Sequence, residues 1–206
     1  MTHSHPSIPP LEPDFLAGCN SLLKPTQSTY TDRLSRLVTA LKQTDNRSPA
    51  VWIAEPGPSS SYFTGAFASS DWHLSERPFL IAITPAEDGV SPNITLLTPE
   101  FERIRAQLKP LPEQVEGHLG WVSWQESESP YDVLAQHPGK KGGVLVDPMV
   151  RNFISAGLAR TMEGCGDTID AEKAVASIRE RKDEREIGLL RCANQVSTPS
   201  YQRLNS

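Results

Sequence analysis

The hydrophobic residues of the chain gather in short runs that are separated by polar turns. Three runs, Val51–Ala54, Phe79–Ile83 and Val144–Val146, are apolar throughout and end near turn-forming residues. Because neighbouring side chains of a strand point to opposite faces, an unbroken apolar run predicts a strand buried on both faces. Similar runs occur at Ile94–Leu97 and Trp121–Trp124. We therefore expect a central sheet that is covered on both sides.

Helical periodicity appears between these runs. From about Thr31, apolar residues recur at intervals of three and four, which predicts a helix that ends by Asn46. The segments 99–108, 130–136 and 148–162 begin with proline, which suits the first helical turn because its missing N–H has no partner there. Strands that alternate with helices predict an α/β fold with helices on both faces of the sheet.

The segment 99–108 places three apolar residues, Phe101, Ile104 and Leu108, on one face of its predicted helix. This spacing is typical of an amphipathic helix.

The composition divides the chain into parts. Residues 1–27 contain five prolines among polar residues, which predicts an extended tail, and residues 28–168 contain the predicted strands and helices. Residues 169–184 are highly charged and are expected to form a solvated linker. A last helix then begins, because Asp183 followed three residues later by Glu186 matches a capping box, and Pro199 is expected to close it.

The overall charge and hydropathy exclude several classes of protein. The chain has 206 residues, 37% of them hydrophobic, and a mean hydropathy of −0.39, and no apolar run approaches the ~20 residues that span a bilayer. The net charge of −5 gives no broad basic surface that could neutralise phosphates. We expect neither a membrane nor a nucleic acid as a partner.

The cysteines and the first residues indicate in which cellular compartment the protein is expected. Cys19, Cys165 and Cys192 lie far apart, are odd in number and form no C-x-x-C motif, so they are expected to be reduced thiols. The first residues show neither a positive segment nor an apolar stretch of the kind found in signal peptides. The expected location is therefore the cytoplasm.

Motifs that could carry chemistry are weak. Gly57–Ser61 follows a predicted strand, as a serine nucleophile elbow would, but the pattern requires a closing glycine where this chain has Ser61, and an ordinary turn fits better. The five histidines show no spacing typical of a metal site. We therefore assign no catalytic residue, no metal ligand and no cofactor to this chain.

One segment carries a specific resemblance. Ile178–Asn194 fits the pattern I-R-x-x-K-[DS]-x-x-E-I-x-x-[LI]-[RK]-x-A and resembles the junction between the N-terminal and catalytic domains of the creatinase, prolidase and aminopeptidase P family. Ser61–Gly65 looks like the Y-x-T-G segment of that family, and Asp147–Ile154 looks like the segment after its late strand. The resemblance covers about residues 31–196 and implies that the sheet is mixed.

In that family a separate catalytic domain holds two divalent metal ions with two Asp, one His and two Glu. The resemblance implies that residues 185–206 are the start of a truncated catalytic domain, so the last helix is expected to be an orphan. A metal pair and a peptide substrate are expected only with the missing domain, and a homo-oligomer is expected to form through the N-terminal domain.

Two classes of function follow from the resemblance. The first is the non-catalytic N-terminal domain of a proline-directed metallopeptidase, which serves oligomerisation and shapes the substrate cleft. The second is a free-standing binding or regulatory protein derived from that family.

The segment from Gly65 to Arg77 is the candidate functional loop. It is a long connection between two predicted strands and carries Trp72 and His73, which we expect to be exposed near its tip. The resemblance implies that such a loop reaches a substrate cleft. The alternative is that Trp72 packs as a lid on its own domain.

Overall fold

The computed structural model describes residues 13–44, 50–137, 143–162 and 171–204. The chain separates into two compact units. One contains residues 27–178, and the other combines the residues up to Thr26 with residues 179–206. Each unit is described by itself.

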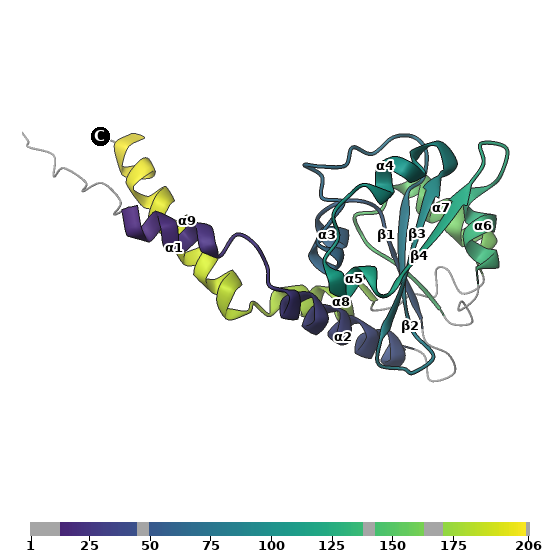
Figure 1. The fold of residues 1–206 in the computed structure, drawn as a ribbon, viewed down its shortest axis with the longest axis horizontal. Helices are drawn as coiled ribbons and strands as arrows, with labels where there is room; N and C mark the ends of the chain where they lie inside the picture. Colours follow the sequence, from purple (N-terminus) through teal and green to yellow (C-terminus); the bar gives the residue numbers. More distant parts are fainter. Residues whose placement is uncertain (1–12, 45–49, 138–142, 163–170, 205–206) are drawn as a thin grey trace, which may run out of the picture. The chain divides into compact units, whose positions relative to one another are not determined.

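The larger unit is built on a five-stranded mixed sheet (Figure 1). In chain order its strands are β1 (Val51–Ala54), β2 (Leu80–Pro85), β3 (Pro92–Pro99), β4 (Leu119–Trp124) and β5 (Val144–Val146). In space the order is β4-β3-β2-β1-β5. The pairs β1–β2 and β2–β3 are antiparallel, whereas β1–β5 and β3–β4 are parallel. The mixed sheet that the resemblance implied is confirmed.

Helices of the larger unit cover both faces of this sheet. They are α2 (Gln27–Thr44), α3 (Pro58–Thr64), η1 (Glu100–Glu102), α4 (Arg103–Gln107), α5 (Glu113–Glu116), α6 (Pro130–Gln136), α7 (Asn152–Thr161) and α8 (Ala171–Glu180). One core cluster joins Trp52 and Ile81 of the sheet to Leu37 of α2. The other joins Ile53 of the sheet to Ile154 of α7. All four residues of β1 are buried, as its unbroken apolar run predicts.

The serine-rich segment after β1 is a helix rather than the expected turn. The hydroxyl of Ser60 accepts a hydrogen bond from the N–H of Gly57 at 2.8 Å, which secures the start of α3. Ser60 is fully buried, so its hydroxyl caps a helix and is not presented to solvent.

The smaller unit corrects three expectations. Residues Pro13–Ser21, expected in an extended tail, form helix α1, and the last helix, α9 (Glu184–Leu204), continues past Pro199. Cys19 of α1 and Cys192 of α9 are joined by a disulfide with their Cα atoms 5.9 Å apart, so these two cysteines are not reduced thiols. The third, Cys165, lies outside the described residues. A fourth correction concerns the expected linker, which is in part helical as α8, most of it in the larger unit.

The start of α9 has the predicted capping box. The N–H of Glu186 donates to Asp183 Oδ1 at 2.6 Å, and the N–H of Asp183 donates to Glu186 Oε2 at 3.1 Å. Helix α9 lies outside the unit of residues 27–178. It is nevertheless linked to α1, while Ile187 and Leu190 on α9 remain exposed. Among the described helices, none has both the length and the apolar character of a membrane span.

Candidate functional site

The candidate loop begins at a glycine that the local packing requires. Gly65 ends α3 in the left-handed region, at φ +73°. A Cβ atom there would lie 2.7 Å from the Pro112 side chain and 2.8 Å from the ring of Tyr30. Both the conformation and the close contacts therefore favour glycine where the loop leaves the helix.

Trp72 is a buried anchor of this loop, which corrects the expectation that it is exposed. Only 2% of its surface is accessible. Its ring lies 4.8 Å from Phe79 and 5.5 Å from Phe67, measured between centroids, and the Arg105 guanidinium lies 4.2 Å above it. The alternative, in which Trp72 packs on its own domain, is the one observed.

His73 is exposed at the surface, as predicted, and Leu74 beside it is 43% exposed. The backbone on either side is fixed, because Trp72 is buried and the carbonyl of Ser75 accepts a hydrogen bond from Arg151 at 2.6 Å. The loop therefore presents His73 and Leu74 from a rigid support.

Arg151 secures the loop through a buried carboxylate that the sequence analysis missed. Its Nη2 lies 2.6 Å from Oε1 of Glu55, its Nε lies 3.0 Å from the same oxygen, and its backbone N–H donates to Oε2 at 2.9 Å. Glu55 is 5% exposed and directly follows β1, while Arg151 comes shortly after β5. Because β1 and β5 are parallel neighbours, their carboxyl ends meet at one edge of the sheet.

The sequence contains a signal for buried charge at this edge of the sheet. Charged residues stand directly after two apolar runs, at Glu55 and at Asp147, which is 3% exposed. The Oδ1 atom of Asp147 accepts a hydrogen bond from the N–H of Met149 at 3.0 Å. Charge at the carboxyl ends of neighbouring strands was thus readable, but the partner of Glu55 was not.

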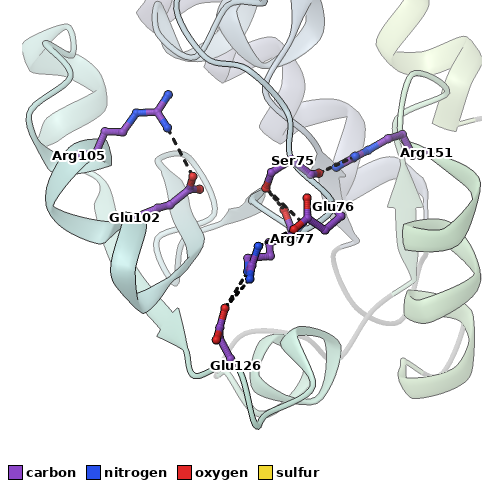
Figure 2. A network of polar contacts seen from close by, with 7 residues as sticks. All are labelled: Ser75, Glu76, Arg77, Glu102, Arg105, Glu126 and Arg151. Carbon is purple, nitrogen blue, oxygen red and sulfur yellow. Dashed lines mark hydrogen bonds and ion pairs between the residues drawn. The ribbon is translucent and has the colours of Figure 1, made fainter.

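A second set of ion pairs ties the loop to its surroundings (Figure 2). Arg77 contacts Glu126 at 2.6 Å and Glu76 at 2.5 Å, and its guanidinium lies 5.2 Å from the ring of Phe101. The hydrogen bond to Glu126 raises the pKa of Arg77 above its usual value. These groups are solvent-exposed, so each pair stabilises the fold only slightly, and the pair with Glu126 is the one that links the loop to another segment.

Beside the loop lies an exposed apolar surface, which we call the apolar stripe. It consists of Phe101, Ile104 and Leu108, which are 60%, 69% and 78% exposed. Phe101 lies in η1, Ile104 lies in α4 and Leu108 directly follows α4, whereas the buried residue of α4 is Ala106. Exposed apolar side chains that cluster in this way are typical of interaction surfaces.

The described residues do not fit a metal centre. Within residues 13–44, 50–137, 143–162 and 171–204, no group of three or more His, Cys, Asp or Glu side chains could hold a metal ion. We therefore derive no reaction step through a metal from the described residues. The chemistry available at the loop is recognition through an imidazole, an aliphatic side chain and the apolar stripe.

Three solved structures have a similar fold. Dipeptidase PepE from Mycobacterium ulcerans matches with a TM-score of 0.61 and 21% identity, over 80% of this chain but 40% of that protein. A dipeptidase from Pyrococcus horikoshii OT3 matches with a TM-score of 0.56 and 18% identity, over 84% of this chain and 43% of its own length. A prolidase from Thermococcus sibiricus matches with a TM-score of 0.51 and 19% identity, over 77% and 39%.

These similarities show that the α/β fold is shared with dipeptidases and a prolidase, and that this chain spans about two fifths of their length. No protein-family model and no curated protein sequence matches the chain.

Proposed function

We propose that the chain is the non-catalytic N-terminal domain of a proline-directed metallopeptidase, and that it serves oligomerisation and shapes the substrate cleft. The observation that carries the proposal is the partial match to the dipeptidases and the prolidase, which covers most of this chain but about two fifths of theirs. The junction motif at Ile178–Asn194 supports the same assignment. In such an enzyme, the metal pair and the site of peptide cleavage would lie outside this domain.

Oligomerisation is assigned to the apolar stripe, and the partner is a second copy of the chain. If two copies paired there, three large apolar side chains would be removed from water. Each side chain that becomes fully buried would stabilise the dimer by roughly 1.5–3 kcal/mol. Polar residues surround the stripe, including the ion pairs Arg103–Glu100 at 2.9 Å and Arg105–Glu102 at 3.4 Å. An apolar centre with a polar rim is the usual organisation of a protein interface.

Cleft shaping is assigned to His73 and Leu74. The rigid support of Trp72 and Arg151 holds them in one conformation, so little conformational entropy is lost when they meet a peptide. Trp72 supports the loop from below in this assignment and does not touch the substrate. In a complete enzyme that carries this domain, His73→Ala is expected to raise KM, and Val90→Ala, at an exposed position on the β2–β3 turn, is expected to leave KM unchanged.

Sedimentation velocity tests the oligomerisation. The wild-type chain is expected to form dimers that dissociate on dilution, and Ile104→Glu is expected to sediment as a monomer because it places a charge in the centre of the stripe. Val90→Glu is the matched control, since Val90 is 70% exposed but lies outside the stripe, and it is expected to behave as wild type. A wild-type chain that stays monomeric at its solubility limit, or an Ile104→Glu variant that still dimerises, would contradict the assignment.

A further inference from the structure

A cavity lies against the disulfide of the smaller unit. Its volume is about 600 Å³, and Cys19 and Cys192, both half-buried, contribute to its lining. Figure 1 shows α1 running beside α9, the two helices that supply these cysteines. Both cysteines of the S–S bond therefore contribute to the wall of a space large enough for a small molecule.

The residues that line the cavity favour the binding of an apolar molecule. Leu23 and Leu190 contribute to it and are 63% and 54% exposed, so an apolar molecule in the cavity would remove them from water. The charged side chains at the cavity are one lysine, Lys182, and one glutamate, Glu186, whose charges oppose each other. The cavity thus offers apolar contact without a net charge that would attract an anionic or cationic ligand.

The disulfide also holds α1 in place. Of the α1 side chains that the structure describes, that of Cys19 is half-buried and the others are exposed. Just beyond the helix, Leu22 packs against Gly188, and its carbonyl accepts a hydrogen bond from Arg185 at 2.8 Å. A helix of nine residues is marginal in water on its own, so α1 depends on these few links.

We propose that the Cys19–Cys192 disulfide is a reversible modification site, at which a thiol that carries an apolar group enters the cavity and exchanges with the S–S bond. The incoming thiolate attacks one sulfur, a new S–S bond forms between them, and the other cysteine leaves as a thiolate that takes up the proton lost by the incoming thiol. No external oxidant or reductant is required. The exchange breaks the covalent link between the helices and releases α1 from α9.

Exchange kinetics of the full chain test the site, in a Cys165→Ser background that leaves only the two bonded cysteines. The chain is incubated separately with phenylmethanethiol and with 2-mercaptoethanol at equal thiolate concentration, then alkylated and weighed by mass spectrometry. Untreated protein is expected to contain no alkylatable thiol. Phenylmethanethiol is expected to form the mixed disulfide about tenfold faster, because partial burial of its ring favours the reacting complex.

Two tryptophan substitutions on α9 test whether the preference for phenylmethanethiol depends on the cavity. Ala193 lines the cavity, so Ala193→Trp is expected to fill it and abolish the preference for phenylmethanethiol. Gln195 is exposed on the same helix and does not line the cavity, so Gln195→Trp is expected to keep the preference. After modification, the amides of α1 are expected to lose protection against hydrogen exchange.

Four results would overturn the proposal. They are two free thiols in untreated protein, equal rates for the two thiols, an Ala193→Trp variant with unchanged preference, and α1 amides that stay protected after modification.

Discussion

Removing the charge of Arg151 tests how the candidate loop is held. Arg151→Met keeps an apolar stem but leaves Glu55, whose side chain is 3% exposed, without its ionic partner. Removing one member of a fully buried pair costs about 3–5 kcal/mol. The Arg151 side chain is 31% exposed, so solvent already screens part of the attraction, and the backbone N–H of Arg151 still donates to Glu55. We therefore expect a loss of roughly 2–3 kcal/mol in the free energy of unfolding.

Urea denaturation monitored by tryptophan fluorescence measures this loss. All four tryptophans lie in the unit of residues 27–178, so the signal reports on the α/β unit. The double variant Glu55→Gln/Arg151→Met is the matched control, because it removes the unpaired charge together with its partner. It is expected to be more stable than Arg151→Met by about 1–2 kcal/mol. An Arg151→Met variant within about 0.5 kcal/mol of wild type would refute the reasoning, as would a double variant less stable than Arg151→Met.

Two further predictions concern local packing and titration. Gly157→Ala is expected to lower the free energy of unfolding, measured by thermal denaturation, by about 1–3 kcal/mol, because the alanine Cβ would lie 2.3 Å from the Tyr131 ring. The loss should be smaller in a Tyr131→Leu background. A single variant more stable than wild type would contradict this packing. Hydrogen bonds from the Ser91 hydroxyl and from the backbone N–H groups of Val90 and Ser91 lower the pKa of Asp88 from 3.8 to about 2. Since the folded pKa is depressed, the stabilisation is present above about pH 4 and is lost as the pH falls toward 2. An NMR titration should return this pKa, and Ser91→Ala should raise it; an Asp88 pKa near 3.8 in the wild-type chain would contradict the account.

The strands were predictable because their signal is local. Val51–Ala54 and Val144–Val146 are apolar at every position, and that pattern has few alternatives once turn-forming residues follow it. Helix α1 was missed because prolines suggested an extended backbone. Pro13 is in fact its first residue, where proline is favoured.

Two of the contacts described above join residues far apart in the sequence, which is why the pattern could not reveal them. Glu55 and Arg151 are 96 residues apart, and Cys19 and Cys192 are 173 residues apart. The position of Trp72 depended on Phe67 and Phe79, which bury it from both sides of the loop. The prediction that Trp72 is exposed was therefore wrong, because its aromatic neighbours bury it.

The most direct test of the central claim is peptide hydrolysis by the purified chain. The chain is supplied with Mn²⁺, Co²⁺ or Zn²⁺ and an Xaa-Pro dipeptide, and metal content is measured in the same samples, with the Thermococcus sibiricus prolidase assayed in parallel. The account predicts neither proline-directed hydrolysis nor stoichiometric metal in this chain, because two-metal hydrolysis requires clustered ligands and the described residues supply no such cluster. Stoichiometric metal binding together with cleavage of the dipeptide would contradict it.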